Sequence, residues 1–109
     1  MRCPETGNEG AEKPEQRTAL YRLDMPEISR FYGIVITINY DEHLPPHFHA
    51  RYAGDRASFL MTGEVLAGSL PRRARELVRA WARLREAELV VDWIRASRRE
   101  PLLAIAPLD

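Results

Sequence analysis

The chain has 109 residues, of which 45% are hydrophobic, and its 16 basic and 16 acidic side chains give a formal net charge of zero. This length allows one domain, and no apolar run approaches the roughly 18 residues of a membrane helix. A single cysteine excludes an internal disulfide and a multi-cysteine zinc site, and it is typical of a cytoplasmic protein.

Residues 1–24 precede the patterned part of the chain. They are rich in Glu, Gly, Pro, Thr and Asn, and they show no strand or helix periodicity and no apolar segment of a secretion signal. Because such a segment cannot bury enough apolar surface to offset its ordering entropy, it is predicted to be a disordered leader. We expect a single domain over residues 25–109, and Met25 is a candidate for the true start of the protein.

The first predicted strand lies between Ile34 and Tyr40. Apolar isoleucines alternate there with other side chains, which is the period of a strand with one apolar face. Pro45 and Pro46 cannot donate to a sheet ladder, so residues 41–46 are predicted to form a loop.

Two further strands are predicted at His47–Ala53 and Arg56–Thr62, followed by a short strand at 64–67. The dipeptide Gly54-Asp55 between the first two suits a two-residue hairpin turn of type II′. In this register the apolar side chains of the two strands share one face. On the opposite face, the first of these two strands carries His47, His49 and Arg51.

Apolar side chains then recur at helical spacing in two separate phases. The first phase follows Ser69, a good N-cap, and the second restarts after residues 85–88, so two helices are predicted with a break there. The first phase consists of Leu70, Ala74, Leu77, Val78, Trp81 and Leu84, and the second consists of Leu89, Val90, Trp93, Ile94 and the small polar residue Ser97.

Residues 102–107 are expected to form a short C-terminal strand or an extended tail. Together these elements predict an α+β fold. We expect an antiparallel β-meander of three or four strands, followed by two helices packed on its apolar face.

Several motifs in residues 25–108 resemble those of one bacterial family. They are MPEISRFYGI (25–34), HLPPHFHARY (43–52), GEVLAGSLP (63–71) and IAPL (105–108). On these residues the chain is similar to the domain-of-unknown-function family numbered 4160. That resemblance implies no activity. Members are often encoded beside another small protein, similar to toxin–antitoxin pairs, which implies a partner protein encoded by the adjacent gene.

All three histidines of the chain lie within residues 41–49, which suggests a metal site. His43, His47 and His49 can each offer an imidazole, and Asp41 or Glu64 can add an oxygen. Three such ligands suit a divalent metal such as zinc and leave one position open for catalysis. The structural alternative is that the histidines only hold the loop, through hydrogen bonds to Thr37, Asn39 or a covering segment.

The same residues suggest a metal-free hydrolase or ribonuclease as a further alternative. Here His43, His47 and His49 would act as general acid and base, and Arg51 would stabilise the developing phosphorane charge. Against this, nothing in the sequence fixes two histidines on opposite sides of a phosphate.

A row of arginines on the first predicted helix is a candidate surface for RNA, DNA or an acidic partner. Its members are Arg72, Arg75, Arg79 and Arg83. The alternative is an ordinary solvated helix face, and the zero net charge weakens the case for nucleic acid.

These patterns predict a small cytoplasmic component of a toxin–antitoxin-like two-gene module. It would bind a partner protein, and RNA or DNA, through the histidine-bearing strand face, without contact with a membrane. The alternative from another class is a small hydrolase or ribonuclease that depends on a metal or on histidine.

Overall fold

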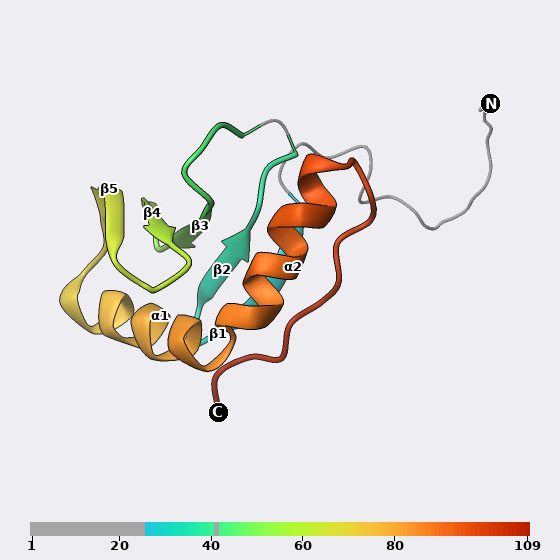
Figure 1. Ribbon diagram of the computed structural model, residues 1–109. Helices are drawn as coiled ribbons and strands as arrows, with labels where there is room; N and C mark the ends of the chain where they lie inside the picture. The colour runs from blue at the N-terminus through green and yellow to red at the C-terminus, as the bar shows by residue number, and fades with distance from the viewer. Residues whose placement is uncertain (1–25, 41) are drawn as a thin grey trace.

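The protein is described by a computed structural model that covers residues 26–40 and 42–109 (Figure 1). The predicted leader at 1–24, the proposed start at Met25 and the candidate ligand Asp41 lie outside the described residues. The α+β prediction is confirmed: a sheet is followed by two helices. The elements are β1 (Glu27–Phe31), β2 (Ile34–Thr37), β3 (His47–Tyr52), β4 (Asp55–Leu60), β5 (Val65–Ser69), α1 (Arg72–Leu84) and α2 (Glu86–Ser97).

The sheet is an antiparallel meander in which each strand pairs with its neighbours in sequence, in the order β1-β2-β3-β4-β5. The sequence predicted three or four strands and missed β1. In β1 the pairing with β2 is irregular between Glu27 and Ser29, so Ile28 and Ser29 are both buried and the two-residue alternation is lost. The turn to β2 is made by Tyr32 and Gly33, with φ of 50° and 80°.

The β3–β4 turn lies one residue earlier than predicted. Ala53 and Gly54 form it, with φ of 50° and 89°, as a type I′ turn requires, and Asp55 instead opens β4 opposite Tyr52. Because the pairing thereby shifts by two residues, the division into faces is unchanged. His47, His49 and Arg51 therefore occupy one side-chain row of β3, as predicted.

The helices differ from the prediction at their ends and in their faces. Ser69 closes β5 rather than capping α1, whose N-cap is Pro71. The predicted break is confirmed at Arg85. Leu84 was expected on the apolar face but is 68% exposed. In α2 the buried residues are Leu89, Asp92 and Ala96.

One apolar core joins the sheet and the two helices. Trp81 of α1 is fully buried, with its ring centre 5.3 Å from that of Phe31 and 5.7 Å from that of Phe48. Phe48 in turn stacks on Phe59 across β3 and β4 at 5.4 Å. Rings of this size and contact supply a large share of the burial that holds a small domain together.

Residues 101–109 form an extended tail, which is one of the two alternatives that the sequence predicted for this segment; the other was a short strand. The tail runs from the end of α2 back towards β1 (Figure 1), where the amide of Ile105 donates to the carbonyl oxygen of Ile28 at 2.8 Å. The carbonyl of Ala106 accepts from the Trp81 indole at 2.8 Å. Within the described residues, neither helix has the length and apolar composition needed to cross a membrane.

Candidate functional site: a histidine and glutamate cluster at the start of β3

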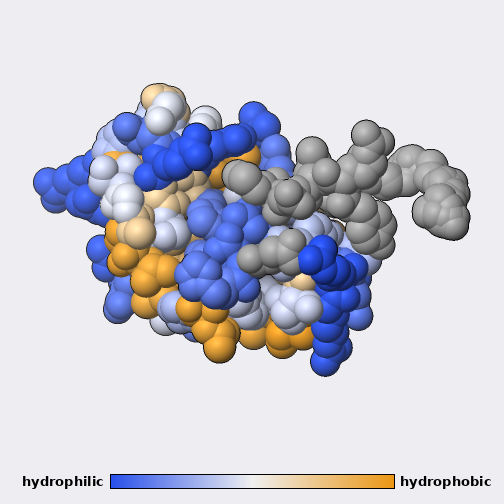
Figure 2. Space-filling model, turned by 90° about the horizontal axis from the view of Figure 1, so that it is seen from above, coloured by the Kyte–Doolittle hydropathy of each residue, from blue (hydrophilic) through white to orange (hydrophobic). Residues whose placement is uncertain are grey.

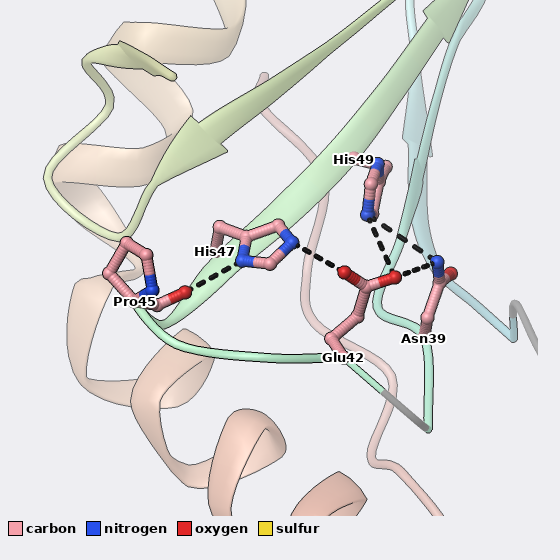
Figure 3. Close-up of polar contacts among 5 residues, drawn as sticks. All are labelled: Asn39, Glu42, Pro45, His47 and His49. Atoms are coloured by element: carbon pink, nitrogen blue, oxygen red, sulfur yellow. Dashed lines mark hydrogen bonds and ion pairs between the residues drawn. The ribbon is translucent and has the colours of Figure 1, made fainter. Parts of the chain in front are cut away.

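Three side chains converge where the loop after β2 enters β3. Glu42 comes from the loop, and His47 and His49 come from β3 (Figure 3). One ligand atom of each lies within 4.8 Å of the others. We refer to these three residues as the His-Glu cluster.

His47 is held by hydrogen bonds at both ring nitrogens and is only 4% exposed. Nδ1 lies 2.7 Å from the carbonyl oxygen of Pro45, and Nε2 lies 2.8 Å from Oε1 of Glu42 (Figure 3). Because a carbonyl oxygen only accepts, Nδ1 must carry a proton. Nε2 faces an ionised carboxylate, so it either carries a second proton or shares a cation with Glu42.

Glu42 is the centre of the cluster. Burial raises the pKa of Glu42, but hydrogen bonds from Asn39 and His47 and the charges of nearby imidazolium groups outweigh it, and the pKa lies below its ordinary value. Nδ2 of Asn39 donates to Oε2 of the carboxylate (Figure 3). The carboxylate is therefore ionised at neutral pH, as a metal ligand or an ion-pair partner must be.

His49 forms the solvent-facing side of the cluster. Its Nε2 lies 3.6 Å from Oε2 of Glu42 and 3.5 Å from Nδ2 of Asn39. Burial lowers the pKa of His49, while the charge of Glu42 acts in the opposite direction. The net effect is a pKa of His49 below its ordinary value, which favours the neutral imidazole. Its side chain keeps 30% of its surface exposed, which leaves a route from solvent to the cluster.

The second helix covers the buried side of the cluster. The ring centre of Trp93 in α2 lies 5.4 Å from that of His47. The sequence placed Trp93 among core residues and did not connect it with the histidines. Its packing on His47 helps to keep that ring out of water.

The structure brings together only part of the predicted site. His47 and His49 meet as predicted, but His43 is exposed, and its ring centre lies 6.1 Å from that of His47, outside the cluster. Glu64 is exposed and also lies outside it. Glu42 was missed, because Asp41 and Glu42 are adjacent carboxylates and periodicity cannot tell which of two loop residues faces β3.

Arg51 lies at the opposite end of β3 from the cluster. It is four residues beyond His47, which at about 3.3 Å per residue places the two Cα atoms roughly 13 Å apart. It is exposed and pairs in register with Arg56. Arg51 thus shares the predicted side-chain row without joining the His-Glu cluster.

The four arginines of the predicted row on α1 differ in how far they are exposed to solvent. Arg72 and Arg83 are exposed, whereas Arg75 and Arg79 are partly buried. Arg72 donates to Glu76 at 3.1 Å, which offsets part of its charge. The α1 backbone at Arg79 packs against Gly63, where an added Cβ would come within 3.3 Å of it.

The donor set of the His-Glu cluster fits a small divalent cation. Two imidazole nitrogens and one carboxylate are ordinary zinc ligands at about 2.0–2.2 Å, which places ligand atoms roughly 3.3 Å apart around a tetrahedral ion. Nε2 of His47 lies 2.8 Å from Oε1 of Glu42, and Nε2 of His49 lies 3.6 Å from Oε2, so each imidazole is within about half an ångström of that separation from one carboxylate oxygen.

The fold and the cluster define a small α+β domain that carries a candidate cation site. The chain belongs to the family described as domain of unknown function DUF4160, whose model matches residues 33–94. That range contains the whole His-Glu cluster and Trp93. No curated protein and no solved structure matches the chain.

Proposed function

We propose that the protein binds a divalent metal ion, with zinc as the first ion to test, through Glu42, His47 and His49, and that the ion serves a hydrolytic reaction. The observation that carries this proposal is the convergence of two imidazoles and one carboxylate within 4.8 Å. Imidazole and carboxylate together suit zinc and other first-row divalent ions.

The orientation of His47 supports the proposal. A metal-bound imidazole usually donates its other N–H to a carboxylate or a carbonyl group, which fixes the tautomer. In His47 the hydrogen bond from Nδ1 to the carbonyl oxygen of Pro45 fixes the tautomer and orients Nε2 towards Glu42. A metal ion would bind Nε2 in its unprotonated form, so zinc affinity should fall as the pH is lowered.

Three protein ligands would leave at least one position open on the ion. An ion in such a site supplies a Lewis acid and a bound water of lowered pKa. His47 is buried beneath Trp93 and His49 is partly exposed, so a substrate would approach from the His49 side. Asn39 would position the carboxylate through its hydrogen bond to Glu42.

A metal-free hydrolase or ribonuclease is the second candidate, and one observation favours it. The hydrogen bond between Nε2 of His47 and Glu42 is complete without an ion, at 2.8 Å. In this alternative His49, the partly exposed imidazole of the cluster, would act as general base and acid. The position of Arg51 gives no support for a role in charge stabilisation at His47.

The wider setting that we propose is a toxin–antitoxin-like two-gene module in the cytoplasm. Membership of the family supports it, and the protein encoded by the adjacent gene would be the partner. Exposed arginines on α1, such as Arg72 and Arg83, together with the histidine-bearing face of β3, would contact RNA, DNA or the partner.

Metal titration of the purified full chain tests the proposal. Zinc at 100 times its dissociation constant should raise the free energy of unfolding by about 2.7 kcal/mol. Glu42→Gln and His49→Ala should each remove most of that gain. His43→Ala is the matched control, because His43 is exposed, adjacent in sequence and outside the cluster.

Equal loss of zinc binding in the control variant, or no binding by the unchanged protein, would reject the metal site. Growth of cells that express the protein then tells whether the cluster performs chemistry or only binds. If growth arrest is lost in the His47→Ala/His49→Ala double variant, the cluster is catalytic. Arrest that persists in that variant would exclude chemistry at these histidines.

A further inference from the structure

The outward face of α2 carries an unusual row of exposed aliphatic side chains. Val90 is 40% exposed, Val91 is 45% exposed and Ile94 is 41% exposed. With Ala87 they recur at three and four residues, which places them along one side of the helix. The opposite side already buries Leu89 and Ala96 in the core, so α2 is apolar on both sides.

A groove runs beside this row, between α2 and the C-terminal tail. It holds about 280 Å³, enough for aliphatic side chains. Its lining is mostly apolar and consists of Ala87, Glu88, Val91, Leu103, Ala104 and Ile105. Figure 2 shows hydrophobic residues gathered along the lower side of the view, the side on which α2 lies in front of the sheet in Figure 1. The aliphatic row and the groove together form what we call the α2 surface.

The charges at the ends of α2 indicate what covers this surface. Glu86 and Glu88 lie in the first turn, whereas Arg95 lies in the last turn and Arg98 directly follows the helix. A second copy that packs antiparallel on α2 would set acidic ends against basic ends. A parallel copy would set like charges together, which is unfavourable.

We infer that the α2 surface is the interface of a two-fold symmetric homodimer, in which α2 of one copy packs antiparallel on α2 of the other. A two-fold interface uses the same patch twice, so it needs a ridge and a groove on one surface. The α2 surface has both: the Val90 and Ile94 ridge of one copy would enter the groove beside Val91 of the other. Towards the two ends of the helix pair, Glu88 of one copy would face Arg95 of the second copy. Within its own chain Glu88 lies 3.4 Å from Arg85, and Arg95 donates to the carbonyl oxygen of Pro101 at 2.6 Å, so these contacts would be shared with the interface.

Sedimentation of the full chain across a wide concentration range tests this inference. The unchanged protein should move from monomer to dimer as its concentration rises, and Val91→Glu or Ile94→Glu should keep it monomeric. Ala80→Glu is the matched control, because Ala80 is exposed on the other helix. Circular dichroism melting identifies any variant that fails to fold.

A charge exchange tests the antiparallel arrangement even if the aliphatic variants misfold. Glu88→Arg and Arg95→Glu each place like charges across the interface and should weaken self-association by about tenfold, as surface ion pairs allow. Mixed in equal amounts, the two variants restore both unlike pairs, so a mixed dimer should form at a concentration where neither variant dimerises alone.

Two results would overturn the inference. One is a monomer at every concentration, including near-millimolar protein. The other is an unchanged dimer in Val91→Glu and Ile94→Glu. If the protein from the adjacent gene binds and is released by those substitutions while the chain alone stays monomeric, the α2 surface belongs to that partner and the homodimer is rejected.

Discussion

The two helices are nearly equal in length and each carries one tryptophan, yet they do different work. In α1 the tryptophan is fully buried and the outer side carries arginines. In α2 the tryptophan is only partly buried, packs on His47, and lies opposite an exposed aliphatic row. The difference shows that α1 serves the core and solvent, whereas α2 connects the core with the candidate site and leaves an aliphatic row exposed.

The largest expected effect comes from the α1 tryptophan. Trp81→Ala should lower the free energy of unfolding by about 3–5 kcal/mol, because it leaves a cavity beneath Phe31 and Phe48. It also removes the hydrogen-bond donor of the Ala106 carbonyl. Chemical denaturation measures the loss, and a value below 1 kcal/mol would contradict the assignment of Trp81 to the core.

A smaller loss of stability is expected for the α2 tryptophan, together with an effect on the cluster. Trp93→Ala should cost about 1–3 kcal/mol, because the side chain is only partly buried. It should also weaken zinc binding, since His47 loses its cover. Calorimetric titration with zinc should show weaker binding in Trp93→Ala than in Trp81→Phe, because only Trp93 packs on His47. Equal zinc binding by the two variants would contradict this difference between the helices.

The pH dependence of stability should identify Glu42 as an ion-pair partner. The pKa of Glu42 is lower in the folded protein than its ordinary value of 4.5. Its contribution is therefore present above about pH 4.5 and is lost as the pH falls through the folded pKa. The deficit of Glu42→Gln relative to the unchanged protein, about 1–3 kcal/mol for a hydrogen-bonded charge, should shrink on acidification. Urea unfolding measured from pH 7 down to pH 3 tests this.

Asp92 of α2 should behave in the opposite way. It is fully buried, accepts from the amide of Leu103 at 2.9 Å, and has a pKa raised by burial above its ordinary value of 3.8. Its contribution is fully present below that value and is lost as the pH rises through the folded pKa. The stability of Asp92→Asn relative to the unchanged protein should therefore increase from pH 3 to 7. A decrease over that range would contradict the raised pKa.

The smallest effect is expected on the outer side of α1. Arg83→Ala should change the free energy of unfolding by no more than about 0.5 kcal/mol, because the side chain is exposed. The change should instead lower affinity for any nucleic acid that the protein binds. Thermal melting with a gel-shift measurement separates the two effects, and a large loss of stability would show that the arginine row is structural.

Local patterns predicted the regular elements of the fold but not its irregular ones. The β2, β3 and β4 strands and the break at Arg85 follow from periodicity. β1 was missed because its bulge interrupts the alternation. The hairpin turn was placed one residue late because Gly54 fits either turn, and a positive φ at Ala53 is uncommon for a residue with a side chain.

Only the residues of the candidate site that lie on β3 were predicted from the sequence. His47 and His49 lie two residues apart on β3, so the alternation of a strand places them together. Glu42 and Trp93 reach them from a loop and from a helix, which no local pattern specifies. In the same way, periodicity assigned Val90 and Ile94 to the core, because α2 has two apolar sides and the pattern does not tell which of them is buried.

The contacts of the tail bear on how the protein folds as it is synthesised. Ile105 bonds to the first strand, and Ala106 accepts from the tryptophan at the centre of the core. These partners follow the five strands and both helices in the chain. The packing of Trp81 therefore cannot be completed during synthesis until residues 105 and 106 have left the ribosome, after both helices have already emerged.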